Sequence, residues 1–454
     1  MKRRTPQFSA LLATSAVLFA TQNSSVVAQL PGFEIESTGT VSPNLPDDSW
    51  ASDINNQGVV AGTSFYTNNL GFTSFRPVLY SDTGLEPLMT YGSASLMGLN
   101  QSGDSVGFKL GRGSRAHIWY STGGDADLHY GPLQTSIASA VSDSREVVGS
   151  YDFLDNNPVD IRRGFYCDPT GNYLTMPTLG GQGSGASDIN AFGQIVGLAE
   201  DTSDHPRAAT WDLGASVQSL GVGGELSSSS GINNRGQIIG TWVDTQDQVH
   251  GFFLDQGSIL DLPTLLPFQN AIPADINQAG FVVGESSNQG TSRHAVIWDR
   301  QQNVTDLQTL IPANSGWDLE TATGINDLGE ISGFGFLQGK KRGYRLTPIC
   351  LRPRISGAQP AIAGSSASTI YAAGFTPQTT VHYFWGTQNG RFSAFGYHLD
   401  IADPRWIGQS NADDHGRSHL ETSIPLTLLG RLILTQAVDL SSGRPSILMK
   451  QRVL

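Results

Sequence analysis

Short apolar stretches alternate with polar turns along most of the chain. The stretch ASDINNQGVVAG (51–62) shows the pattern, with an apolar residue on each side of the polar turn from Asn55 to Gly58. Asn at the first turn position can bond its own backbone two residues on, and Gly at the fourth adopts a positive φ without a Cβ penalty. The stretch therefore predicts two short strands joined by a tight reversal. No window shows helical periodicity.

This hairpin pattern recurs six more times, with a mean period of about 45 residues, the size of one unit in a propeller or solenoid. The further copies are LMGLNQSGDSVG (96–107), SAVSDSREVVG (139–149), ASDINAFGQIVG (186–197), SSGINNRGQIIG (229–240), PADINQAGFVVG (273–284) and ATGINDLGEISG (322–333). Each copy ends on a Gly, which allows a β-bulge or a close backbone approach. The glycines lack a following helix and a P-loop lysine, so they do not predict a phosphate site.

A second repeated pattern follows each hairpin: a basic residue, then Ala, Gly or Pro, then a short apolar strand. We call it the second column of the repeat alignment, and its basic residues the basic column. Its basic members are Arg76, Arg115, Arg163, Arg207, His250, His294 and Arg342. A fourth strand containing Leu comes after it, as in SILDLPTL. Four short strands per copy predict an all-β propeller blade.

The two ends of the repeat region complement each other. The last copy stops after its third strand, at RGYRLTP, while GFEIESTGTV near the N-terminus reads as an unpaired fourth strand. We expect the N-terminal strand to complete the last blade, because closure removes exposed sheet edges. This predicts a seven-bladed closed propeller over residues 32–347. Another blade count and an open array are the alternatives.

The two columns together resemble the extracellular HAF-repeat family, named for a His-Ala-Phe tripeptide. The tripeptide is best matched at 294–296 and 250–252, and the Asp-Ile-Asn half at 53–62, 188–197 and 275–284. Five copies depart from the pattern with Arg in place of His, and the third hairpin has Ser142 and Arg145 in the Asn and Gly columns. The resemblance implies secretion and a repeat scaffold, and supplies no catalytic residues. The third turn is expected to be less tightly held.

The repeat ends near residue 347. A Pro- and Gly-bearing linker (348–365) leads into residues 366–454, where short strands near STIYAAG, TTVHYFWG, RWIGQSN, RSHLETSIP, RLILTQAVDL and PSILMKQRVL predict a small β-sandwich. This segment resembles Ig-like modules appended to secreted proteins of environmental bacteria, through ADDHGRSHLETSIP and LTQAVDL.

The first 28 residues have the pattern of a secretory signal peptide. A basic start (Lys2 to Arg4), an apolar run to Ala20 and small residues up to Ala28 predict cleavage near Ala28. A membrane anchor is the alternative, but the apolar run is short for a span. We expect an exported bacterial protein, secreted or at the cell surface, without a membrane span in the mature chain.

Charge narrows the classes of partner. The mature chain keeps 24 basic and 40 acidic residues, a net charge of −16. An acidic chain without a basic run is a poor match for nucleic acid or anionic membranes. The two cysteines, Cys167 and Cys350, exclude a disulfide framework; they are either a single bridge or two buried thiols.

The seven basic residues of the second column are the candidate ligand-binding residues. As a collar with one member per blade they suit an anionic ligand such as an acidic glycan. The structural alternative, which we favour, is that each one bonds a neighbouring loop or the Asp beside the turn, such as Asp53, Asp188 or Asp275. The long loops 63–75 and 150–162 are the other place where a site is expected.

No catalytic, cofactor or metal signature stands out. The histidines are scattered, and the group from Asp413 to His419 is more typical of a solvated turn. Asp47-Asp48 is a weak candidate for Ca²⁺. The leading hypothesis is a secreted, non-enzymatic scaffold that binds an extracellular glycan, matrix component or protein. A propeller carbohydrate-active enzyme, hydrolase or lyase, and a purely structural surface or matrix protein stay open.

Overall fold

The computed structural model describes residues 32–452 except for sixteen short gaps. These gaps are 42–47, 68–72, 89–91, 112, 129–134, 154–160, 214–215, 289–291, 350–353, 357–367, 376–377, 395–396, 414–416, 430, 440–443 and 447–448. The signal peptide, Asp47, Cys350, most of the linker and the middles of the two long loops lie outside the described residues.

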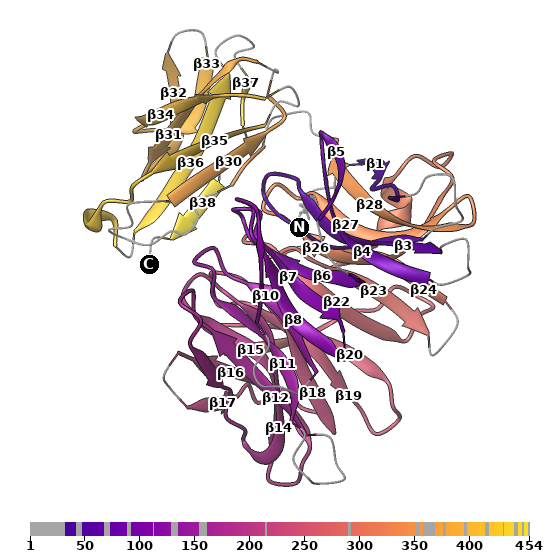
Figure 1. Ribbon diagram of the computed structural model, residues 1–454. Helices are drawn as coiled ribbons and strands as arrows, with labels where there is room; N and C mark the ends of the chain where they lie inside the picture. Colours follow the sequence, from indigo (N-terminus) through magenta and orange to yellow (C-terminus); the bar gives the residue numbers. More distant parts are fainter. Residues whose placement is uncertain are drawn as a thin grey trace, which may run out of the picture. The chain divides into compact units, whose positions relative to one another are not determined.

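Seven four-stranded antiparallel sheets follow one another along residues 33–348 (Figure 1). In order, sheets one to three are β2 (Ser49–Ile54), β3 (Val60–Thr67), β4 (Thr73–Ser81), β5 (Gly84–Pro87); β6 (Ala94–Leu99), β7 (Ser105–Leu110), β8 (Ser114–Trp119), β9 (Asp125–Asp127); and β10 (Ser136–Val141), β11 (Val147–Phe153), β12 (Ile161–Cys167), β13 (Tyr173–Thr175). Sheets four and five are β14 (Gly180–Ile189), β15 (Gln194–Asp201), β16 (Pro206–Asp212), β17 (Val217–Ser219); and β18 (Leu226–Ile232), β19 (Ile238–Val243), β20 (Val249–Asp255), β21 (Ser258–Leu262).

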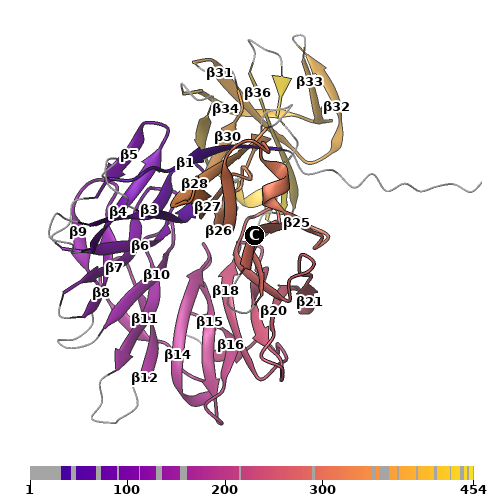
Figure 2. The same cartoon turned by 90° about the vertical axis from the view of Figure 1, so that its right-hand side faces the viewer.

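Sheets six and seven complete the series. They are β22 (Asn270–Ile276), β23 (Val282–Asn288), β24 (Ser292–Trp298), β25 (Val304–Asp306); and β26 (Trp317–Ile325), β27 (Ile331–Leu337), β28 (Lys340–Pro348), β1 (Phe33–Ser37). A short 3-10 helix, η1 (Leu307–Leu310), follows β25. Consecutive sheets pack side by side, and the first strands of neighbouring sheets contact one another (Figure 2). The all-β propeller-type prediction is confirmed by these sheets.

The N-terminal strand belongs to the seventh sheet. β1 pairs antiparallel with β28, from Phe33 opposite Pro348 to Ser37 opposite Tyr344. Phe33 is buried, so the strand is held by side-chain packing as well as by the ladder. The fourth strand of this sheet thus comes from the other end of the repeat region, as the sequence predicts.

The closing Gly of each hairpin allows a close approach that recurs in all seven sheets. The first strand has a register shift beside it, for example between Ala51 and Asp53. A Cβ on Gly284 would lie 2.1 Å from the Ile272 carbonyl oxygen, and one on Gly62 would lie 2.5 Å from the Trp50 carbonyl oxygen. No side chain fits at these distances, which explains why Gly recurs there.

The core lies between neighbouring sheets. One cluster combines Ile239 and Phe253 of sheet five with Ala271, Val282 and Trp298 of sheet six. The apolar strand that ends on an aromatic residue supplies the largest members, and Trp298 is fully buried. Each sheet therefore depends on its neighbours for burial of its apolar faces, as expected for repeat units.

The C-terminal strands form two sheets around one core. Three strands, β29 (Arg354–Ile355), β30 (Ser368–Ala373) and β35 (Ser418–Thr422), form one sheet; five, β34 (Arg405–Asn411), β31 (Thr380–Gly386), β36 (Leu432–Asp439), β37 (Arg444–Pro445) and β38 (Met449–Arg452), form the other. Ile370 and Ile355 of the first sheet share a core cluster with Tyr383 and Ala437 of the second, which makes a sandwich.

Two features of this region differ from the predicted strands. The hairpin of β32 (Asn389–Ala394) and β33 (Tyr397–Ile401) had not been predicted, and β29 lies within the predicted linker. A 3-10 turn, η2 (Leu426–Leu428), precedes β36. Across the described residues, no helix has the length and apolar character that crossing a membrane requires.

Candidate functional site

The Asn of each hairpin turn connects one sheet to the next. Its side-chain oxygen accepts from its own turn; Asn55 Oδ1 accepts from the N–H groups of Gln57 and Val59, both at 3.1 Å. Its Nδ2 donates to the backbone carbonyl of the next turn. These contacts are Asn55 to Asn100 (3.1 Å), Asn100 to Ser142 (3.1 Å), Asn190 to Asn233 (3.2 Å), Asn233 to Asn277 (3.0 Å), Asn277 to Asn326 (3.1 Å) and Asn326 to Asn55 (2.9 Å).

The residue at the second position of the turn forms a second series of contacts in every sheet except the fourth. Its side chain accepts from the backbone N–H of the preceding sheet's turn, as Gln101 does from Asn56 (2.8 Å) and Asp327 from Gln278 (2.8 Å). The last sheet contacts the first in the same way, because Asp327 N–H donates to Asn56 Oδ1 at 2.8 Å. We call the surface formed by these turns the asparagine face.

The junction between sheets three and four cannot make either contact. Ser142 has no amide group to donate to the next turn, and Ala191 has no side-chain acceptor for the N–H of Asp143. The seven turns therefore have the same place in their sheets but differ in the hydrogen bonds that they make to the neighbouring turns.

The third turn is held by a different contact. Arg145 takes the Gly position with φ +65°, and its Nε donates to Asp104 Oδ2 in sheet two at 2.7 Å. Asp104 is buried, and the hydrogen bonds from Arg145 and Ser121 outweigh burial and lower its pKa. Ser142 closes the turn by accepting from Glu146 N–H at 3.1 Å.

Three carboxylates lie beside the turns on the innermost strands. Asp53, Asp188 and Asp275 each accept from the N–H of the following residue and from an N–H of the next sheet, as Asp188 does from Ile232 at 2.9 Å. Their described partners are backbone N–H groups, and none of the described pairs of the basic column involves these three carboxylates. Burial is the main cause that raises the pKa of Asp188 to about 7 and that of Asp275 to about 6.

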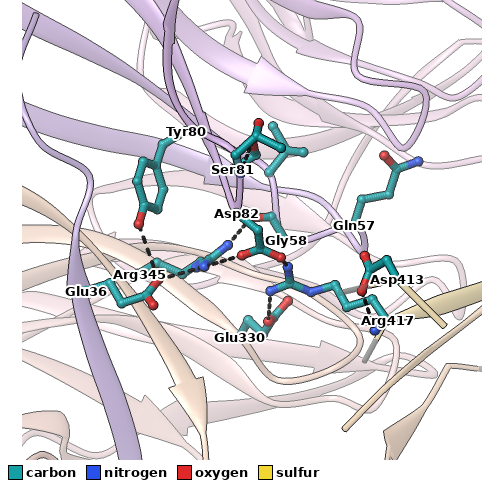
Figure 3. A network of polar contacts seen from close by, with 12 residues as sticks. Glu36, Gln57, Gly58, Tyr80, Ser81, Asp82, Glu330, Arg345, Asp413 and Arg417 are labelled. Carbon is teal, nitrogen blue, oxygen red and sulfur yellow. Dashed lines mark hydrogen bonds and ion pairs between the residues drawn. The ribbon is translucent and has the colours of Figure 1, made fainter. Parts of the chain in front are cut away.

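A network of ion pairs joins the two ends of the repeat region to the C-terminal sandwich (Figure 3). Arg345 of β28 donates to Glu36 of β1 and to Asp82, between β4 and β5, both at 2.6 Å. Arg417, just before β35, pairs with Asp82 and with Glu330 (2.8 Å). Glu330 in turn accepts from Asn326 at 2.7 Å. The two arginines therefore share the Asp82 carboxylate, and the sandwich is tied to the asparagine face.

An apolar contact and a cavity accompany this network. Leu328 in the seventh turn packs with Tyr371 and Ala373 of β30. A cavity of about 580 Å³, the sandwich cavity, lies between the first turn and the sandwich. Its walls include side-chain amides, hydroxyls, carboxylates, a guanidinium and an imidazole, contributed by Asn56, Gln57, Asp82, Tyr371, Gln378, Asn411, Arg417 and His419.

A second cavity, of about 410 Å³, lies between sheets one and two; we call it the sheet-two cavity. It shares Gln57, Val59 and Ser81 with the sandwich cavity, so the two are neighbours. Both belong to the asparagine face beside the first sheet. A cavity of about 600 Å³ lies at the equivalent place between sheets two and three, where Val147, Cys167 and Tyr173 are among the residues that line it.

The basic column lies away from these cavities. The closing Gly of each hairpin pairs with a residue of the third strand, and the basic residue lies two positions before that residue. In the first sheet, for example, Gly62 pairs with Val78, and the basic residue is Arg76. This places the column toward the connection between the second and third strands, at the far end from the asparagine turns. The structure therefore brings none of the seven candidates into the sandwich or sheet-two cavity.

Most of the column has partners within its own sheet. Arg207 pairs with Asp201 (2.8 Å), His250 with Asp244 (3.0 Å), His294 with Asp306 (3.0 Å) and Arg115 with Asp127 (3.4 Å). Arg76 lies over the Tyr66 ring (5.2 Å), Arg342 lies 4.0 Å from Asp48, and Arg163 of β12 is half-buried. The acidic partners offset the charge of an electropositive collar, so its ligand-binding role stays a prediction.

Metal and thiol chemistry add little to the asparagine face. Within the described ranges, no group of three or more His, Cys, Asp or Glu side chains is placed to hold a metal ion. Cys167 is a buried free thiol, and burial raises its pKa.

Comparison with known proteins gives fold-level likenesses only. No family model and no curated protein matches the chain. Among solved structures, it is similar to the β-propeller domain of the Trilobed protease from Pyrococcus furiosus, with 10% identity, 66% of this chain and 93% of that chain covered, and a TM-score of 0.47. A puromycin hydrolase matches at 14% identity over 75% of this chain and 62% of its own length, with a TM-score of 0.47.

TolB from Acinetobacter baumannii matches at 13% identity over 67% of this chain and 86% of that chain, with a TM-score of 0.36. Because each of these TM-scores is below 0.5, the description of the fold rests on the strand order of this chain.

Sequence reasoning missed the residues that form the asparagine face cavities. Arg417 lies in a stretch that was interpreted as a solvated turn, a predicted strand and part of an Ig-like segment, and Asp82 and Glu330 are isolated acids near turns. Aligning the repeats gives a signal for residues of this kind. A position that is apolar in most copies and polar in one copy marks a place where that copy differs in function or packing.

Proposed function

We propose that this chain is an exported, non-enzymatic scaffold that binds an extracellular ligand on its asparagine face. In this proposal the leader is removed near Ala28, and residues 32–347 form a closed seven-bladed ring of the HAF-repeat type. The C-terminal sandwich acts as an Ig-like module that forms part of the site. Secretion and the cell surface are the proposed locations, and a polar glycan is the proposed ligand class.

The sandwich cavity is the observation that carries the proposal. It is lined by residues of the repeat region and of the sandwich, and the ion pairs of Arg417 with Asp82 and Glu330 join its two sides. Alternating donors and acceptors in its walls suit a ligand rich in hydroxyl groups, which both donates and accepts. The nearby arginine and carboxylates compensate one another, so no strong net charge is expected in the cavity.

A binding screen tests this proposal. Residues 29–454 would be applied to a microbial and algal glycan array with and without Ca²⁺, and the same samples would be checked for released products. Binding without turnover is the expected result, and His419→Ala in the sandwich cavity should weaken it. Product release would instead support a propeller carbohydrate-active enzyme. Absence of glycan binding would reject the glycan as ligand and favour a structural role or a protein partner.

A further inference from the structure

One row of side chains in sheet two differs from its counterparts in every other sheet. Ser105, Trp119 and Asp125 are cross-strand neighbours on β7, β8 and β9. The equivalent rows are Val60–Tyr80–Leu85, Val147–Cys167–Tyr173, Ile195–Trp211–Val217, Ile238–Leu254–Ile259, Val282–Trp298–Val304 and Ile331–Leu346–Ile35. Only sheet two places a hydroxyl and a carboxylate on either side of the central residue, and this row lines the sheet-two cavity.

The central tryptophan shows what the row has lost. In sheets four and six the indole Nε1 donates to a backbone carbonyl, from Trp211 to Pro177 at 2.9 Å and from Trp298 to Pro263 at 2.8 Å. Trp119 is 4% exposed, yet its Nε1 has no hydrogen-bond partner among the described residues. The hydroxyl of Ser105, which is fully buried, also lacks a described partner. An unmade hydrogen bond at a buried group costs about 1–3 kcal/mol, so two of them on one cavity wall point to a missing ligand.

The third member of the row is already oriented. Asp125 Oδ2 lies 2.5 Å from Nε2 of the buried His117, which fixes the carboxylate and leaves Oδ1 for another donor. Glu86 adds a second carboxylate to the wall, and no Lys or Arg is among the residues that line it. An anionic sugar would be repelled there. An ammonium ion would pair with the acids, but it offers no acceptor to Trp119 or Ser105.

We propose that the sheet-two cavity binds one unit of an uncharged sugar, with Trp119 Nε1 and the Ser105 hydroxyl bonded to its oxygens and Asp125 accepting from one of its hydroxyls. This inference rests on the proposed function, adds the sheet-two cavity to its site and narrows its ligand to uncharged sugars. Neutral sugar hydroxyls both donate and accept, so a single ring can satisfy all three groups. The adjoining sandwich cavity holds the neighbouring units of the same chain.

The test is calorimetric titration of residues 29–454 with named probes: xylohexaose, cellohexaose and mannohexaose as neutral sugars, an alginate hexamer as the acidic sugar, and spermidine as the amine. At least one neutral hexamer is expected to bind more tightly than alginate or spermidine. Trp119→Phe keeps an aromatic side chain but removes the five-membered ring with its N–H, and should weaken binding roughly tenfold. Ser105→Val restores the apolar row of the other sheets and should weaken binding by a similar factor.

The control is Trp298→Phe, which removes a satisfied hydrogen bond in sheet six. It should leave affinity unchanged and lower Tm more than Trp119→Phe does, because both variants lose buried ring volume and only Trp298→Phe also loses a hydrogen bond within the protein. A preference for alginate or spermidine would overturn the proposal.

Two further outcomes separate this inference from the proposed function. If Trp119→Phe and Ser105→Val bind the sugar like the unmodified protein while His419→Ala weakens binding, the site is the sandwich cavity alone and this inference is wrong. If no neutral hexamer binds, the inference is wrong, and binding of any other glycan on the array would still support the proposed function.

Discussion

Each turn Asn serves two sheets with one side chain. The Oδ1 of Asn233 closes its own turn by accepting from Arg235 and Gln237, and its Nδ2 donates to Asn277 of the next sheet. Only a side-chain amide combines an acceptor and a donor in this geometry. The recurrence of Asn thus reflects contact between sheets as much as turn conformation, and only the turn role is readable from one copy of the motif.

The buried carboxylates predict a dependence of stability on pH. Burial raises the pKa of Asp188 to about 7 and of Asp275 to about 6, from an unfolded value near 3.8. The folded state therefore holds these protons more tightly, so their stabilisation is complete below pH ~4 and is lost as pH rises to ~7. Tm should fall over this range, and Asp188→Asn should flatten the fall. An unchanged slope in the variant would contradict the assignment.

Asp201 supplies the opposite case as a control. The hydrogen bond from Arg207 lowers its pKa to about 2. Its contribution is present above pH ~4 and is lost as pH falls toward 2. Asp201→Asn should therefore change the acid limb of the Tm profile and leave the slope between pH 4 and 7 as it is.

The hairpin is the element that the sequence describes best. The turn Asn, the positive φ of Gly58 (+73°) and the close approach at the closing Gly are all local properties, and each was predicted from residues within one copy. The partners of the basic column, the contacts of Asp53 and the role of Arg417 were not predicted. They depend on which residues of different sheets and of the sandwich are brought together. A single sequence does not reveal the strand pairing that decides this.

A glycine substitution tests the hairpin geometry. In Gly284→Ala the new Cβ would lie 2.1 Å from the Ile272 carbonyl oxygen, a backbone atom that cannot move away without disturbing the ladder. We expect a loss of unfolding free energy of about 1–3 kcal/mol or more, measured by urea denaturation. Gly223→Ala is the matched control, since nothing lies within 4 Å of its added Cβ. Equal stabilities for the two variants would contradict the account.

At the scale of the whole molecule, Arg417 ties regions far apart in the chain to one another. Its side chain is 13% exposed and pairs with Asp82 and Glu330, whose side chains are 10% and 1% exposed. Arg417→Ala leaves Glu330 buried without its cation, and removing one partner of a buried pair costs about 3–5 kcal/mol. Thermal unfolding should show a clearly lower Tm and an earlier transition of the sandwich.

A surface pair gives the scale for that result. Arg115 lies 3.4 Å from Asp127, and the two side chains are 43% and 45% exposed, so Arg115→Ala should cost less than about 1 kcal/mol. If Arg417→Ala is no more destabilising than Arg115→Ala, the network of Figure 3 does not hold the sandwich to the repeat region.

The pairing of β1 with β28 has a consequence for the order of events during biosynthesis. Glu36 and Arg345 are 309 positions apart, so the first strand to emerge has no partner until almost the whole repeat region has been made. Contacts of such long range form late, and an incomplete chain leaves β1 without its partner and its last-made strand as an unprotected edge. Prematurely terminated products should therefore self-associate, whereas the full chain should complete its seventh sheet in a single, late and concentration-independent step.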